Sequence, residues 1–308
     1  MTTVDPILNL TSQCIEPSVV MEGYLADLRD LYAMEADGGK TAAVKDAIGK
    51  FVRNASQRII TMIGNLVTRL SEMIGAIGNM TAKKVQAPKE LVESFNKMLD
   101  RTQKITKDGS KYVKTLEEIN NALATAAQFQ RWMFGRGQEG VFQDLADAKK
   151  EFAQEVKAIA DDDVLAGRSV DDYMSTLKEK VGERVTFEPS KAQRILTPMR
   201  AYWSTRMRMM KVSAHKMTAM INQNLIMAKD SNEKDRIKRT QSIFGEIYSY
   251  MMTIVTGMIK ICGYLQKYIT TIRKASKLDA ITGDTVEGRV VEREKPMQFQ
   301  KALTAGNA

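Results

Sequence analysis

The stretch PMRAYWSTRMRMMKVSAHKMTAMINQNLIMA, residues 198–228, decides the fold of this chain. It contains no carboxylate, and its apolar side chains recur at the spacing of one face of an α-helix. Thr197 and Pro198 form a start signal, because Thr is a favoured N-cap and Pro fits the first helical position. We therefore predict a helix from Pro198 to about Ala228. Its apolar stripe consists of Met199, Trp203, Met210, Ala214, Met217, Ile221 and Leu225.

A second long stripe follows after a turn at Asp230–Asn232 and predicts a helix from about Glu233 to Lys277. A short connection forces neighbouring helices to lie antiparallel, so we expect residues 198–277 to form a coiled-coil-like hairpin. The second stripe consists of Ile243, Ile247, Met251, Ile254, Met258, Ile261, Leu265, Ile269 and Ile272.

The part of the chain before residue 198 also has helical periodicity. The strongest stripe predicts a helix from Thr41, in which Gly64, Gly75 and Gly78 are expected to allow a bend or close helix approach. Pro88 marks the next turn, and Ser169 with Asp172 has the spacing of a capping box. Further helices are predicted over 91–133, with a break at 107–109, and over 141–160 and 170–182. The strongest stripe consists of Ile48, Val52, Ala55, Ile59, Met62, Leu66, Leu70, Met73 and Ile77.

These patterns predict an all-α fold, an elongated bundle of long amphipathic helices. We divide the chain into an N-terminal segment (1–40), a helical bundle (41–280) and a flexible tail (281–308). A short amphipathic helix is expected within the N-terminal segment, with Val20, Tyr24 and Leu28 on one face. No convincing strand precedes residue 284, and 285–291 is at best one short strand.

Charge is distributed unevenly along the chain, whose net charge is +9. Residues 189–229 carry eight basic side chains and no acidic one, whereas 139–188 hold thirteen acidic and seven basic residues, a net of −6. A basic helix favours an anionic neighbour, which is an acidic helix, the phosphate backbone of a nucleic acid or a lipid surface. The residues predicted to contact phosphate or an acidic partner are Arg200, Arg206, Arg208, Lys211 and Lys216.

No motif of the chain indicates catalysis, a cofactor or a metal. Residues 135–140 match GxGxxG, but a dinucleotide site needs a preceding strand, so a helix–helix turn is expected instead. Asp161–Asp163 lacks calcium-loop spacing and is interpreted as a solvated helix end. His215 has no companion ligand for a metal. Trp203 falls on the apolar stripe, which favours a core position over base stacking. We predict a protein that is not an enzyme.

Membrane and redox signals are also weak. The longest uncharged apolar segment is residues 247–259, which is shorter than the roughly 20 residues needed to span a bilayer. The N-terminus has no secretory signal pattern. Cys14 and Cys262 have no spacing typical of a zinc site or a disulfide framework.

Two short sequences in the N-terminal part, VMEG at 20–23 and AMEA at 33–36, resemble the sites cut by capsid maturation proteases. Such proteases act on delivery segments of tailed-bacteriophage head proteins and cut after Glu, which places candidate processing sites at Glu22 and Glu35. With its basic, Met-rich helical body, the chain resembles an internal head or prohead-core protein. The resemblance implies a location in the capsid interior, after synthesis in the host cytoplasm, in contact with DNA.

We therefore expect a virion structural protein that forms homo-oligomers and contacts other virion subunits and packaged DNA through basic helices. Two alternatives stay open. One is a membrane-active pore or ejected channel protein, because the amphipathic 243–272 segment and the helix at 48–80 could lie in a lipid interface. The other is a soluble coiled-coil scaffold.

Overall fold

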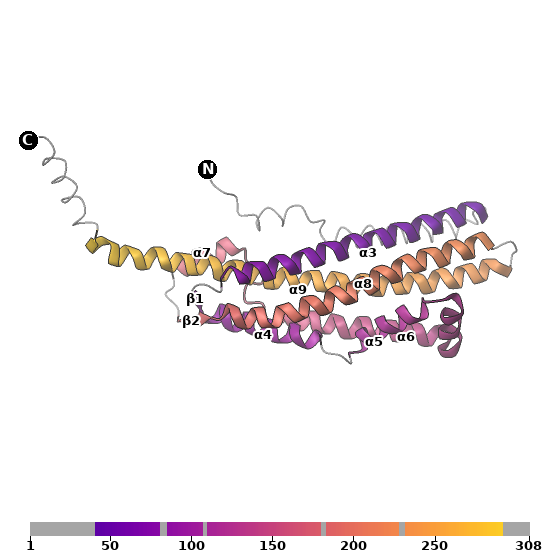
Figure 1. The fold of residues 1–308 in the computed structure, drawn as a ribbon, viewed down its shortest axis with the longest axis horizontal. Helices are drawn as coiled ribbons and strands as arrows, with labels where there is room; N and C mark the ends of the chain where they lie inside the picture. The colour runs from indigo at the N-terminus through magenta and orange to yellow at the C-terminus, as the bar shows by residue number, and fades with distance from the viewer. Residues whose placement is uncertain (1–40, 81–84, 107–109, 180–182, 228–231, 292–308) are drawn as a thin grey trace, which may run out of the picture.

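The computed structural model describes residues 41–80, 85–106, 110–179, 183–227 and 232–291. Long helices run side by side along one axis, so the predicted all-α, elongated bundle is confirmed (Figure 1). Three predictions lie outside the described residues: the N-terminal segment 1–40 with its short helix, the processing sites Glu22 and Glu35, and the end of the tail (292–308). The helices are α3 (Thr41–Gly78), α4 (Lys89–Ile105), α5 (Lys111–Ala122), α6 (Ala126–Asp161), α7 (Val170–Glu179), α8 (Pro189–Met227) and α9 (Asn232–Val291).

Helix α9 is the central element of the bundle. Its 60 residues extend for roughly 90 Å at 1.5 Å per residue. It packs against α3 and α6 and also against α4, α7, α8 and the strand β1. All nine stripe residues predicted between Ile243 and Ile272 are buried. The helix continues past Lys277 to Val291, so the short strand suggested at 285–291 is wrong.

Three tyrosines fasten α9 to three different neighbours. The Tyr248 hydroxyl lies 2.5 Å from Ser56 Oγ of α3. The Tyr250 hydroxyl donates to the carbonyl oxygen of Tyr112 on α5. The Tyr268 hydroxyl accepts from the Val164 amide at 2.7 Å and lies 2.8 Å from Ser94 Oγ. Each polar group is thus satisfied inside the core, where an unpaired one would be costly.

Helices α3 and α8 form the most extensive helix pair, with α8 running back along α3. The predicted coiled-coil hairpin of 198–277 is therefore not confirmed, because α8 packs mainly on α3 and less on α9. The predicted stripe of α3 is buried from Val52 to Ile77. Similar apolar stripes on several helices made the choice of partner undecidable from spacing alone.

The predicted helix start at Thr197-Pro198 is wrong, since α8 begins at Pro189 and includes Pro198 in its interior. Pro189 fits the first helical position, and the Glu188 carbonyl oxygen accepts from the Lys191 amide at 3.1 Å. Pro198 gives up one helical hydrogen bond, but burial of Leu196 and Met199 on either side holds the helix together.

A two-stranded antiparallel sheet closes one end of the bundle, contrary to the expectation of no strand in this part of the chain. Strand β1 (Val85–Pro88) pairs with β2 (Arg184–Phe187), and Val85 lies opposite Phe187. Strands of four residues are too short to produce a clear alternating pattern.

Two local predictions are confirmed. Gly137, inside the GxGxxG match, has φ 71° and breaks α6 at a kink, so this segment is a helix–helix turn preceded by helix. At the start of α7, the Ser169 amide donates to Asp172 at 3.1 Å and the Asp172 amide donates to Ser169 Oγ at 3.0 Å. This is the reciprocal pattern of a capping box. The Ser169 hydroxyl, which donates to the Asp172 carboxylate at 2.6 Å, and the Ser169 amide lower the pKa of Asp172.

Candidate functional site: the cationic face of α8

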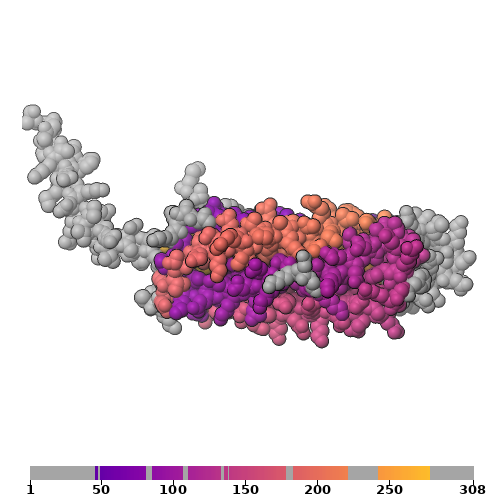
Figure 2. Space-filling view, turned by 60° about the horizontal axis from the view of Figure 1, so that its bottom comes forward, coloured from indigo at the N-terminus to yellow at the C-terminus, as the bar shows by residue number. Residues whose placement is uncertain are grey.

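Helix α8 buries one side against the bundle and leaves the opposite side on the molecular surface. In Figure 2 it forms a continuous band along the molecule. The buried side follows helical spacing, so the residues between its members must project outward. Its buried hydrophobic residues are Ala192, Leu196, Met199, Trp203, Met207, Met210, Ala214 and Met217.

The outward side carries most of the predicted contact residues. Arg200, Arg208 and Lys211 are exposed, and Lys216 is half-buried. None of the four makes an ion pair with a described carboxylate. Arg194, which the sequence did not single out, is also exposed and also lacks such a pair. We call these five residues the cationic face; from Arg194 to Lys216 it extends for about 33 Å along the helix.

Arg206 does not belong to this face. Its side chain is only 16% exposed and its Nη1 lies 2.7 Å from Glu117 Oε1 of α5. Its guanidinium carbon also lies 4.9 Å from the centre of the Tyr202 ring. Arg206 therefore joins α8 to α5, and its charge has a partner inside the molecule. The sequence prediction groups it with Arg208 because both lie in the same basic run.

The acidic segment 139–188 does not neutralise the cationic face through any ion pair between described residues. Its carboxylates pair elsewhere: Asp147 lies 2.8 Å from Lys111 Nζ and Asp144 lies 2.5 Å from Arg136. The hydrogen bond with Asp147 raises the pKa of Lys111, and the same bond lowers the pKa of Asp147. Helix α6 packs on α5, α9 and α4, which directs its acids away from α8.

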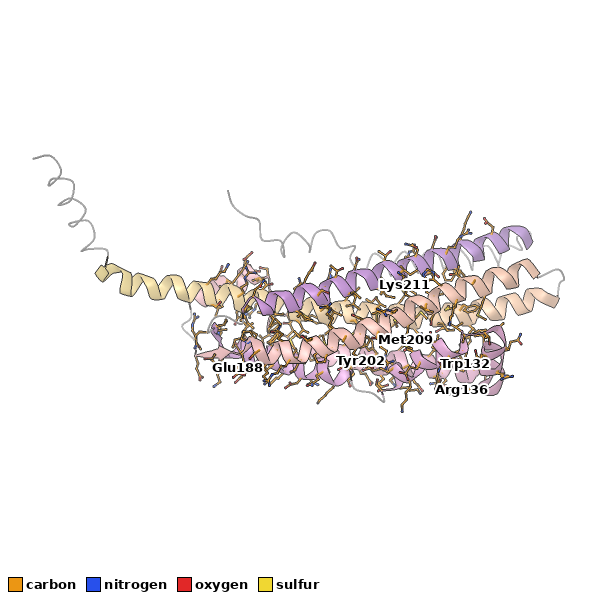
Figure 3. All side chains as sticks on the ribbon, in the orientation of Figure 1. Trp132, Arg136, Glu188, Tyr202, Met209 and Lys211 are labelled. Atoms are coloured by element: carbon orange, nitrogen blue, oxygen red, sulfur yellow. The ribbon has the colours of Figure 1, made fainter. Side chains whose placement is uncertain are left out.

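The aromatic residues beside the arginines are structural. Trp203 is 1% exposed, which confirms its predicted core position. Tyr202 packs edge-on against it, with ring centres 5.6 Å apart. Figure 3 shows Tyr202 and Met209 on the lower side of α8, whereas Lys211 lies on the side toward α3. Stacking of bases on Trp203 would require it to leave the core.

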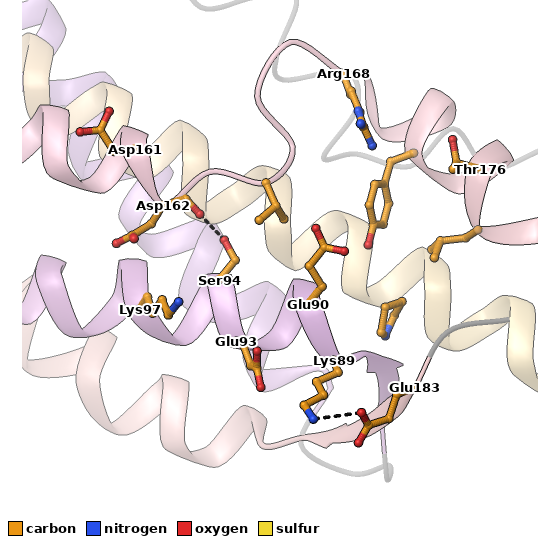
Figure 4. Close-up of a pocket in the computed structure, with 14 residues that line it drawn as sticks. Lys89, Glu90, Glu93, Ser94, Lys97, Asp161, Asp162, Arg168, Thr176 and Glu183 are labelled. Carbon is orange, nitrogen blue, oxygen red and sulfur yellow. Dashed lines mark hydrogen bonds and ion pairs between the residues drawn. The ribbon is translucent and has the colours of Figure 1, made fainter. Parts of the chain in front are cut away.

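A cavity of about 620 Å³ opens near the end of the bundle that carries the sheet (Figure 4). Two interactions cross its lining: Lys89 Nζ lies 2.9 Å from Glu183 Oε2, and Ser94 Oγ donates to the backbone carbonyl oxygen of Asp162. Asp162 also pairs with Arg101, so only Asp161 of the acidic triplet matches the predicted solvated helix end. Within the described ranges, His, Cys, Asp and Glu side chains form no group of three that could hold a metal.

No protein-family model matches this chain, and no curated protein and no solved structure is significantly similar to it. Among the described helices, none combines the length and the apolar composition needed to cross a membrane.

Proposed function

We propose that this chain is a non-enzymatic virion structural protein that contacts packaged DNA through the cationic face of α8 and other virion subunits through the rest of its rod. The observation that carries the proposal is the set of exposed cations on α8 without described counter-charges. A phosphate backbone carries one negative charge per about 1.7 Å of duplex, so a cationic row of about 33 Å can meet several phosphates. Nothing in such contact depends on base sequence.

The bundle suits contact with DNA because apolar side chains fill its core and its helices are long. A rod of packed helices holds the cations of α8 at fixed spacing, which limits the side-chain and backbone entropy lost on binding. The half-buried Met209 and Tyr202 and the buried Trp203 support α8 from below. Arg206 contributes by fixing the rotation of α8 against α5.

The test is binding of the full chain to a 30-base-pair duplex of arbitrary sequence, measured by fluorescence anisotropy between 50 and 200 mM salt. Replacing Arg200, Arg208 and Lys211 with Gln is expected to weaken binding and to lower the salt-dependence slope by about 2–3, because each lost phosphate contact removes about 0.9. An unchanged slope would overturn the proposal.

A matched control uses two exposed lysines on another helix, Lys150 and Lys157 of α6. Their replacement with Gln lowers the net charge without touching α8, so the slope should change much less. Equal losses per charge removed, three in the α8 variant and two in the control, would indicate attraction by net charge alone. Oligomers that form independently of salt and do not bind DNA would favour the coiled-coil scaffold instead.

The virion assignment has its own test. Mass spectrometry and N-terminal sequencing of this protein from purified particles should find it inside the capsid, beginning at Gly23 or Ala36 if the sites at Glu22 and Glu35 are cut. Particles that lack the protein would remove the assignment. A protein beginning at Met1 would remove only the processing sites.

The membrane-active alternative has less support in this fold. Segment 243–272 buries its apolar stripe against α3 and α6, so it offers that face to lipid only after the bundle opens. Dye release from anionic liposomes by the folded protein would favour this alternative over DNA contact.

A further inference from the structure

Where α3 and α8 meet, a strip of surface runs along both helices. Its α3 side is apolar and its α8 side is cationic. On α3, Ser56 and Gly78 both face α8: Ser56 Oγ lies 3.3 Å from the Ala214 carbonyl oxygen, and a Cβ on Gly78 would lie 3.9 Å from Gln193 Nε2. Between them Ile60, Val67 and Ile74 recur every seven residues and must share this flank. All three remain half-buried, so part of each isoleucine and valine side chain is still open to solvent.

The α8 wall of this strip is cationic. Gln193 and Thr218 both face α3, since Thr218 Oγ1 lies 2.7 Å from Ser56 Oγ. Arg200 and Lys211 are spaced from these residues by seven, so they occupy the same flank. Figure 3 shows Lys211 at the boundary with α3. We define the α3–α8 seam by Ile60, Val67, Ile74, Arg200 and Lys211, with Arg208 at its outer edge.

The chain itself contains a segment with the complementary pattern. Residues 1–40 hold seven acidic and two basic side chains, a net charge of −5, whereas the whole chain is +9. Between residues 18 and 36, apolar side chains at Val20, Tyr24, Leu28 and Leu31 have helical spacing, with acids between them. An amphipathic acidic helix needs both an apolar strip and cations beside it, which is what the seam offers.

The point of attachment brings this segment to the seam. Helices α3 and α8 run antiparallel, with Ser56 level with Ala214. Thr41 therefore lies about 22 Å beyond Ser56, and Arg200 lies about 21 Å from Ala214 in the opposite direction. A helix over residues 18–36 would be about 28 Å long, and four extended residues of about 3.3 Å each would join it to Thr41, which together match the roughly 43 Å between Thr41 and Arg200.

We propose that residues 18–36 dock as an amphipathic helix on the α3–α8 seam, with their apolar face on Ile60 and Val67 and their acids beside Arg200, Arg208 and Lys211. The segment then supplies the counter-charge that the described residues lack. Docking itself stands independently of DNA binding. Its consequence, that the segment competes with DNA for the same cations, rests on the proposed function.

Hydrogen–deuterium exchange of the full chain at low salt tests the docking. Amides of residues 20–34 are expected to exchange at least tenfold more slowly than in a synthetic peptide of residues 18–36, because an isolated helix of this length is marginal in water. Reversing three cations (R200E, R208E and K211E) should abolish the protection, and 500 mM salt should reduce it. Fast exchange of these amides in the unaltered chain would overturn the proposal.

Two comparisons identify the occupant and exclude an effect of unfolding. Adding D27K and D30K to the triple reversal should restore protection. The control variant, K150E with K157E, should keep the protection of the unaltered chain. Loss of protection in this control as well as in the triple reversal overturns the proposal. Protection that falls when the protein is diluted also overturns it, in favour of docking on a second copy. If the triple reversal lowers the melting temperature, the Gln variants replace it.

The two proposals fail separately. Loss of protection in the Glu variants together with an unchanged DNA slope in the Gln variants would remove the DNA contact and keep the docked segment. If the unaltered chain shows no amide protection but the Gln variants lower the salt-dependence slope of DNA binding, the docked segment is removed and the DNA contact is kept. If both hold, neutralising Asp27 and Asp30 should tighten DNA binding several-fold.

Discussion

The ring of Phe152 lies directly over Gly257, where α6 crosses α9: a Cβ on Gly257 would be 2.4 Å from Phe152 Cε1 and 3.0 Å from Val156 Cγ2. Phe152 is fully buried and packs edge-on against Tyr112, so its ring has no room to move away. The absence of a side chain at Gly257 therefore sets how closely the two helices approach.

Gly257→Ala should destabilise the protein by about 1–3 kcal/mol through overpacking, despite the better helix propensity of Ala. Gly263 lies on the same helix, and a Cβ there would meet nothing within 4 Å. Gly263→Ala should therefore be neutral or stabilise by up to about 1 kcal/mol. Urea unfolding followed by circular dichroism measures both, and equal effects of the two changes would contradict the close approach.

The hydroxyls of Tyr248 and Tyr268 should contribute different amounts to the free energy of unfolding, although both tyrosines are buried. Tyr268→Phe leaves the Val164 amide without its partner, whereas after Tyr248→Phe the Ser56 hydroxyl keeps Thr218 and the Ala214 carbonyl oxygen. An unsatisfied amide costs about 1–3 kcal/mol, and a lost hydrogen bond with satisfied survivors costs about 1 kcal/mol. Unfolding free energies of the two variants check this order, and the reverse order would refute it.

The stripes of α3 and α9 could be predicted because each keeps its period over many turns, as from Val52 to Ile77. The stripes do not show which helices pair, because each stripe is similar enough to pack on several others. The pairing of α8 with α3 could therefore not be predicted. The close approach at Gly257 was missed for a similar reason, since it depends on where Phe152 falls after folding. By contrast, Gly64 and Gly75, which were expected to allow close approach or a bend, have nothing within 4 Å of an added Cβ.

The candidate site was predicted only as a list of cations. Basic residues without nearby acids in the sequence indicated α8, and four of the five lie on its outward side. Arg206 instead meets the acidic-partner half of the expectation, through Glu117 of α5, a partner that is remote in sequence and could not be named beforehand. Helical position gives a hint: two residues of about 100° each place Arg206 about 160° around the helix from Arg208.

Alkaline pH should weaken the fold through its buried thiol and phenols. Burial raises the pKa of Cys262 to about 12, and burial also raises the pKa of Tyr248, Tyr250 and Tyr268. An acid whose pKa is higher in the folded state stabilises the fold below its unfolded pKa, about 8.5 for Cys and 10 for Tyr, and that stability is lost as pH rises.

The unfolding free energy should therefore be flat from pH 7 to 8 and fall between pH 9 and 12. Cys262→Ala should make the part of the fall that begins near pH 9 shallower, whatever it costs at neutral pH. In a Cys14→Ser background, the remaining thiol should react with a thiol reagent at pH 8 only after unfolding. Rapid labelling of the folded protein would show that Cys262 is accessible and would contradict this prediction.

Substitution of Arg206 should affect stability, and substitution of Arg208 should affect DNA binding. Arg206→Gln removes an ion pair that is half open to solvent on the Glu117 side, together with the contact over Tyr202, so it should cost about 1 kcal/mol of unfolding free energy. It should change the salt dependence of DNA binding little, because Arg206 points toward α5. Arg208→Gln should leave stability within about 0.5 kcal/mol and lower the salt slope by about 0.9. Thermal unfolding and anisotropy on the same preparations measure both effects. If Arg206 instead lowered the slope as much as Arg208, α8 would have to rotate on binding, and the cationic face would have to be redrawn around it.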